Sequence, residues 1–164
     1  MLMICTASSG QNRHLALRLE ELANELGIAT QFLDLTEFDV PLYTPVRDDL
    51  GAPQSVALLS ESFRAADGFF VCAPEYNGSI PPTLTNAIAW MSTQTDDFRA
   101  LFNGKPVAIA THSGGGGQKV LVAMRLQFSH LGCNVVGREL LTNKKKPLRE
   151  ESALSIIGQL QKAM

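Results

Sequence analysis

Short apolar runs alternate with amphipathic stretches along most of the 164-residue chain, and this alternation limits the possible folds more than any other feature. Apolar residues at consecutive positions are typical of strands buried on both faces of a sheet. Apolar residues at spacings of three and four are typical of helices that cover such a sheet. The predicted strands are residues 2–6, 30–35, 68–73, 106–111 and 134–137, and the predicted helices are residues 12–26, 53–66, 83–91, 120–131 and 150–162.

Strands and helices in strict alternation predict an α/β fold with an open, parallel, doubly wound sheet. We expect residues 1–164 to form a single domain, because the sequence contains no repeat or linker and is long enough for one hydrophobic core. Residues 36–52 contain two prolines and show no sustained period, so we expect a long loop there.

Charge and cysteine content narrow the class of function. Fourteen basic and sixteen acidic residues give a formal charge of -2, which provides no field to attract nucleic acid or an anionic membrane. No run approaches the ~20 apolar residues of a membrane span, and the first residues do not resemble a secretion signal. Three cysteines in apolar surroundings indicate a reducing compartment. We therefore expect a cytoplasmic protein without nucleic-acid or membrane partners.

Polar loops follow the first, third and fourth predicted strands. Open parallel sheets bind ligands outside the carboxyl ends of their strands, near the reversal in strand order. The first loop, residues 6–12, places hydroxyls, a glycine and amides before a helix N-terminus. This arrangement suits a phosphate monoester, although an ordinary helix N-cap uses the same residue types.

The other two loops suit a flat ligand. Residues 74–82 have proline at both ends and an aromatic residue between them, so they can hold main-chain groups along the edge of a heterocycle at low entropic cost. Residues 114–117 are four glycines, which let the backbone approach a ligand closely. These glycines match neither a P-loop, nor a dinucleotide fingerprint, nor the nucleophile elbow of a serine hydrolase. We expect no catalytic side chain and no metal site.

Residues 74–90, PEYNGSIPPTLTNAIAW, resemble the most characteristic stretch of the NADPH-dependent FMN reductase family. This flavodoxin-like group includes quinone, azo-dye and chromate reductases. Residues 12–13, 66–68 and 113–117 also fall where the family has similar features. The resemblance implies a flavodoxin-like three-layer sandwich with a five-stranded parallel sheet in the order 2-1-3-4-5.

The resemblance also implies a site for FMN. The phosphate is expected on the first loop and the isoalloxazine on residues 74–77, with the glycine loop on the other side of the ring. The expected FMN-binding residues are Ser8, Gly10, Gln11, Asn12, Pro74, Glu75, Tyr76, Asn77, Ser113 and Gly114. We expect the substitution Asn77→Ala to weaken flavin retention or to slow turnover.

The chain departs from the family pattern in two places. Its first loop is shorter than usual and lacks the arginine that the family commonly carries there. In the helix that follows residue 82, Thr85 and Ala89 stand where the family usually has lysine and aspartate.

The activity implied by the resemblance is a two-step oxidoreduction. NADPH or NADH passes a hydride to FMN, and a small acceptor such as a quinone, an azo compound or free flavin then takes two electrons. Family members usually form homodimers or homotetramers, with the flavin near the subunit boundary.

Three other functional interpretations of the sequence are possible. A flavodoxin-type electron carrier would bind FMN without nicotinamide chemistry, but carriers of this kind tend to be strongly acidic, and the loop of residues 74–82 resembles the reductases. A response regulator would need acidic residues at the ends of the first and third strands, where the chain has Thr6-Ala7 and Ala73-Pro74. A family member that has lost FMN would be a structural subunit.

Overall fold

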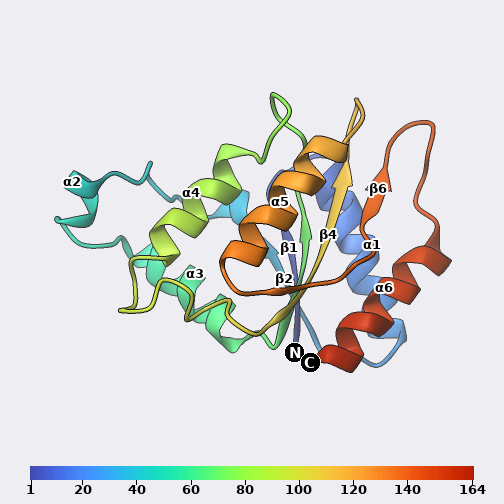
Figure 1. Ribbon diagram of the computed structural model, residues 1–164, viewed down its shortest axis with the longest axis horizontal. Helices are drawn as coiled ribbons and strands as arrows, with labels where there is room; N and C mark the ends of the chain where they lie inside the picture. Colours follow the sequence, from blue (N-terminus) through green and yellow to red (C-terminus); the bar gives the residue numbers. More distant parts are fainter.

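A twisted parallel sheet forms the centre of the protein in the computed structural model, which describes residues 1–164 (Figure 1). The strands are β1 (Leu2–Thr6), β2 (Thr30–Asp34), β3 (Gly68–Cys72), β4 (Pro106–His112), β5 (Asn134–Val135) and β6 (Leu140–Thr142). Their order is β2-β1-β3-β4-β5, β6 also pairs with β4, and every pairing is parallel. The predicted α/β class and the order 2-1-3-4-5 are confirmed.

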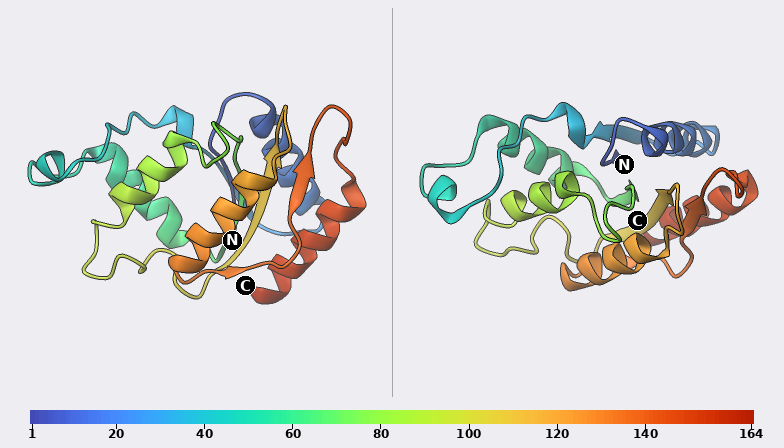
Figure 2. Two further views of the ribbon diagram at one scale, coloured as in Figure 1. Left: turned by 45° about the horizontal axis from the view of Figure 1, so that its top comes forward. Right: turned by 90° about the horizontal axis from the view of Figure 1, so that it is seen from above.

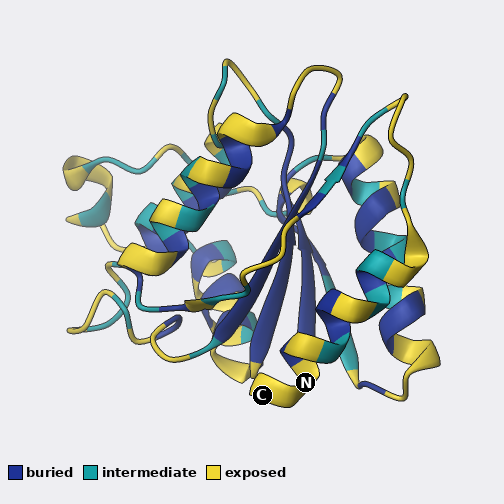
Figure 3. Cartoon of the chain, turned by 45° about the vertical axis from the view of Figure 1, so that its right-hand side comes forward, coloured by how far each residue is buried: buried dark blue, intermediate teal, exposed yellow.

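Helices cover both faces of the sheet, as Figure 2 shows from two directions. α1 (Gln11–Glu25) and α6 (Glu150–Ala163) pack on one face, and α3 (Gln54–Ala65), α4 (Pro82–Met91) and α5 (Gln118–His130) pack on the other. The strands are buried, whereas the outer faces of the helices are exposed (Figure 3). The predicted three-layer sandwich is therefore confirmed. None of these helices has the length and apolar composition needed to cross a lipid bilayer.

The prediction of the last strand, residues 134–137, is wrong at the carboxyl end of that strand. The sheet also has six strands, whereas five were predicted. β5 stops at Val135, although the N–H of Val136 still donates to the carbonyl of Val107 in β4 at 2.8 Å, and strand pairing with β4 begins again at Leu140 in β6. Arg125 of α5 explains the interruption, because its Nη2 donates to the carbonyl oxygens of Val136 and Gly137, at 3.1 and 3.3 Å. Those carbonyls are thereby drawn away from the sheet.

The segment expected as a loop, residues 36–52, projects from one end of the molecule (Figure 1). It includes most of a 3-10 turn, η1 (Leu35–Glu37), and one turn of α-helix, α2 (Pro45–Asp48). Its base is fixed to α4, where the indole Nε1 of Trp90 donates to the carbonyl of Pro41 at 2.7 Å. Asn86 accepts from the N–H of Tyr43 at 2.7 Å. The segment therefore has a defined path despite its lack of periodicity.

A two-residue β-hairpin shapes the loop between β3 and α4. Tyr76 and Ser79 exchange two backbone hydrogen bonds, at 3.1 and 3.0 Å. Asn77 and Gly78, between them, both have positive φ, at 51° and 75°. Two-residue hairpin turns of the I′ type need positive φ at both central positions, and Asn-Gly is the pair best suited to them. The hairpin therefore owes its shape to Asn77 and Gly78.

We predict that Asn77→Ala lowers the free energy of unfolding by about 1 kcal/mol, because alanine is strained in the left-handed region. Asn77→Gly relieves this strain and restores most of the stability. Thermal and urea unfolding of the two variants checks the prediction. Equal stability of the alanine and glycine variants would show that the turn does not depend on backbone conformation at position 77.

Candidate functional site

Four loops meet at the carboxyl edge of the sheet, where β1, β3, β4 and β6 end (Figure 1). Between them lies a pocket of about 440 Å³, which we call the rim pocket. Its lining residues are Ser8, Ser9, Gly10, Gln11, Asn12, Pro74, Tyr76, His112, Gly114 and Lys144. Only two of these side chains are apolar or aromatic, so the pocket presents mainly hydrogen-bonding groups.

The structure brings together seven of the ten residues expected to bind FMN. The other three, Glu75, Asn77 and Ser113, lie in the same loops but do not line the rim pocket. Three lining residues were not among those expected: Ser9, His112 and Lys144. Ser9 and His112 could have been found from the sequence, since one lies in the hydroxyl-rich loop and the other ends a strand. Lys144 comes from beyond the mispredicted last strand.

The first loop offers a set of free backbone donors. The N–H groups of Gly10, Gln11 and Asn12 have no acceptor within the protein, and no side chain caps α1. The first turn of α1 contains no acidic residue. Unpaired N–H groups at a helix start carry about half a positive charge and favour an anion. The donors therefore fit a phosphate monoester without the arginine that the short loop lacks.

The side chain of Asn12 has a different role from its backbone. It is buried, its Nδ2 donates to the carbonyl of His112 at 3.0 Å, and its Oδ1 accepts from the N–H of the same residue at 2.7 Å. This pair of bonds fixes the start of α1 to the end of β4. What Asn12 offers to a ligand is its N–H.

Hydrogen bonds fix one side of the glycine loop, residues 113–117, and its other side is open to the rim pocket. Buried Ser113 donates its N–H to the carbonyl of Thr142 at 3.1 Å, and its Oγ accepts from the N–H of Gly115 at 3.2 Å. A Cβ placed on Gly114 would meet no protein atom within 4 Å. The backbone at Gly114 therefore lies against open space in the rim pocket, as close approach by a flat ligand requires.

Hydrogen bonds orient the side chains of His112 and Glu75, which belong to the loops after β4 and β3. The hydroxyl of Thr142 donates to the carbonyl of Thr111 at 3.1 Å, so it accepts from His112, whose Nδ1 is 3.1 Å away. This leaves Nε2 of His112 without a protein partner. Glu75 accepts from the N–H of Val120 at 3.4 Å, which ties the hairpin loop to the start of α5.

The cysteines take no part in the site. All three are buried, and burial raises the pKa of each thiol, that of Cys133 to about 12. Cys5 and Cys72 lie on neighbouring strands but pack into cores on opposite faces of the sheet. They are protonated core residues, as expected from the sequence.

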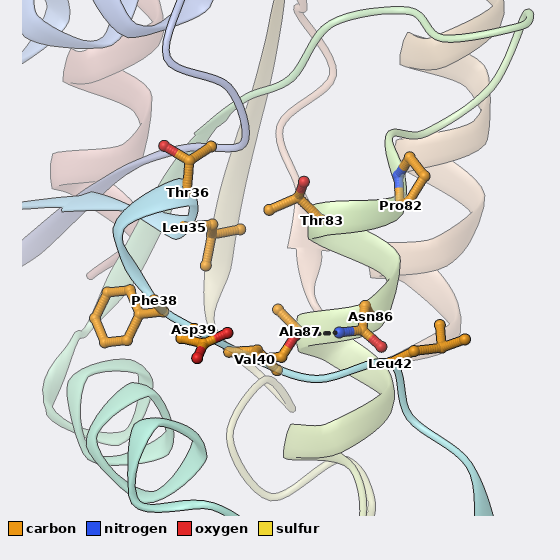
Figure 4. Close-up of a pocket in the computed structure, with 10 residues that line it drawn as sticks. All are labelled: Leu35, Thr36, Phe38, Asp39, Val40, Leu42, Pro82, Thr83, Asn86 and Ala87. Carbon is orange, nitrogen blue, oxygen red and sulfur yellow. Dashed lines mark hydrogen bonds between the residues drawn. The ribbon is translucent and has the colours of Figure 1, made fainter.

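A separate pocket of about 390 Å³ lies between residues 35–42 and the N-terminal half of α4 (Figure 4). We call it the α4 pocket. Asn86 crosses one side of it and donates to the carbonyl of Val40 at 3.3 Å. It shares no lining residue with the rim pocket, and the carboxylate of Asp39 lies in its lining, whereas no Asp or Glu lines the rim pocket. The N–H groups at the start of α1 and the lack of acidic lining therefore favour the rim pocket for a phosphorylated ligand.

Known structures share this fold. The flavoenzyme NAD(P)H:(acceptor) oxidoreductase FerB from Paracoccus denitrificans superposes with a TM-score of 0.75 at 23% identity, over 99% of this chain and 93% of that one. An oxidoreductase from Corynebacterium diphtheriae superposes with a TM-score of 0.78 at 17% identity, over 99% and 94%. At these identities the likeness establishes the flavodoxin-like architecture.

Sequence comparison gives the family. A quinone reductase of Escherichia coli (strain K12) is 43% identical over 103 residues, which are 61% of this chain and 53% of the relative. An NAD(P)H-dependent FMN reductase of Pseudomonas aeruginosa is 37% identical over 89 residues, 54% of this chain and 45% of the relative. The chain thus spans about half the length of these relatives. The family profile described as NADPH-dependent FMN reductase matches residues 2–146, and the chain belongs to this family.

Proposed function

We propose that residues 1–164 form an FMN-binding domain that oxidises NADPH or NADH and reduces a small acceptor, such as a quinone, an azo compound or free flavin. The observation that carries the proposal is the rim pocket, in which three free N–H groups at the start of α1 face the same space as Tyr76 and Gly114. Family membership supports the choice of flavin and nicotinamide as ligands.

The phosphate of FMN is bound by the backbone of residues 10–12. The N–H groups there donate to the phosphate oxygens, and the hydroxyls of Ser8 and Ser9, which have no partner in the protein, supply further donors. Lys144, which also lines the pocket, adds a positive charge. These groups anchor the cofactor by its charged end.

The ring of FMN is positioned by the loops after β3 and β4. Pro74 and Tyr76 line one part of the rim pocket and Gly114 another, so a flat ring system fits between them. The hairpin turn and the bonds of Ser113 hold these loops in place without the ligand, which reduces the entropy lost on binding. Because Tyr76 is 50% exposed, the pocket is accessible to a second substrate.

Bound FMN supplies the redox chemistry itself, accepting hydride from the nicotinamide and giving two electrons to the acceptor. The residues of this chain bind, orient and shield it. No side chain has to act as a general acid or base. With the ring proton on Nδ1, the free Nε2 of His112 can accept a hydrogen bond from a ligand in the rim pocket, which makes it a contact residue.

We further propose a homodimer or homotetramer in the cytoplasm. Large apolar side chains are exposed on the projecting segment, at Leu42, Val46 and Leu50, and on α5, at Val122 and Leu126. Apolar surface of this kind favours association with a partner. Three buried free thiols suit a reducing compartment.

Anaerobic mixing with NADPH tests the activity. The purified protein loaded with FMN is expected to lose the visible absorbance band of oxidised flavin within seconds of mixing, because hydride reaches the bound flavin. Addition of a quinone then restores the band. FMN that binds but stays oxidised in NADPH and NADH would instead support the flavodoxin-type electron carrier, and failure to bind FMN would overturn both.

We predict that Gly114→Ala weakens FMN binding about tenfold, or ~1.4 kcal/mol, while the melting temperature stays unchanged. The added methyl group meets no protein atom but enters the space assigned to the ring. Gly115→Ala is the matched control, because Gly115 does not line the rim pocket and a Cβ there meets only Ser113 Oγ at 3.9 Å. Equal FMN affinity for both variants, measured by calorimetric titration, would place the ring elsewhere.

A further inference from the structure

A second pocket adjoins the rim pocket beside α1. It has a volume of about 560 Å³ and lies between α1 and residues 142–148, the segment that rises beside α1 and α6 in Figure 1. We call it the side pocket. It shares Gln11, His112 and Lys144 with the rim pocket, so the two meet at the start of α1.

The position of this junction decides which ligand can use both pockets. Gln11 belongs to the row of N–H groups assigned to the phosphate. Pro74, Tyr76 and Gly114, assigned to the ring, line the rim pocket alone. A ligand that continues beyond the phosphate of FMN therefore enters the side pocket.

The lining of the side pocket suits a heterocycle joined to a sugar. Leu15 and Leu148 provide apolar surface, together with Pro147. Asn143 uses its Oδ1 to accept from two backbone N–H groups, at 2.9 and 2.8 Å, so its Nδ2 is free to donate. His14 is exposed on the α1 side of the pocket, and its imidazole has no hydrogen-bond partner in the protein. Apolar surface with a few polar groups is typical of nucleotide-sized sites.

Charge in the side pocket favours an anion near the junction. Lys144 lies there, and no Asp or Glu lines the pocket. Arg18, in the third turn of α1, is neutralised by Glu21 and Glu150, each 2.7 Å from its guanidinium. The positive charge is therefore concentrated beside the phosphate position, where a second phosphate would lie, and the far end is nearly neutral.

From this geometry we propose that the side pocket binds the adenylate half of FAD, so that the chain accepts FAD as well as FMN. The second phosphate lies near Lys144 and Gln11, and the adenosine lies along α1 over Leu15. The proposal rests on the proposed FMN site, because it uses the same position for the first phosphate.

Calorimetric titration of the purified chain with FMN and with FAD, at physiological salt, tests the proposal. The wild-type chain is expected to bind FAD at least as tightly as FMN. His14→Glu should weaken FAD at least threefold more than FMN, because position 14 lines only the side pocket, while its new charge lies within a Debye length of the first phosphate and so acts on both flavins. Circular dichroism establishes that the variant is folded.

Lys145→Glu is the control, because Lys145 is exposed in the same segment and lines neither pocket. It should change both affinities less than twofold. FMN binding with FAD tenfold weaker, or an unchanged ratio of the two affinities in His14→Glu, would overturn this inference and leave the proposed function intact. A chain that binds neither flavin would overturn both.

Discussion

The contact between Asn12 and His112 fixes the geometry on which the candidate site depends. These residues are one hundred positions apart in the sequence, yet the Asn12 amide bonds both the N–H and the carbonyl of His112. The start of α1 is thereby held against the end of β4. Its free N–H groups then face the same pocket as the glycine loop, and no charged side chain is needed to aim them. A buried amide bonded at both ends also specifies one arrangement of the loops.

The same geometry explains how a family member can manage with a shortened first loop. The arginine usual in this family would contribute one mobile charge, whereas the start of α1 contributes three N–H groups at fixed positions. Fixed donors lose no side-chain entropy when the ligand binds. The remaining positive charge comes from Lys144, which reaches the pocket from the loop after β6.

Much of this fold could be predicted from the sequence, because a buried parallel strand and an amphipathic helix have different hydrophobic periods. The strand order required the family resemblance, since periodicity alone carries no information on pairing. The end of the last strand was missed because Arg125, 11 and 12 residues upstream, bonds the carbonyls of Val136 and Gly137. Contacts of this kind leave no local pattern in the sequence.

The candidate site likewise has features with a local sequence pattern and features set by distant contacts. Loop composition and resemblance identified seven lining residues, but not how their groups are used. The burial of the Asn12 side chain depends on β4, and the role of Lys144 depends on the position of β6. The hairpin at residues 76–79 did have a local signal, because Asn-Gly between two residues that pair is typical of a two-residue turn.

We propose above all that FMN binds at the carboxyl edge of the sheet, through the backbone N–H groups at the start of α1. Titration of ¹⁵N-labelled protein with FMN tests it most directly, by amide chemical shifts. The largest shifts are expected at Gly10, Gln11, Asn12 and Gly114. Shifts confined to the residues around the α4 pocket, or no shifts at all, would contradict it.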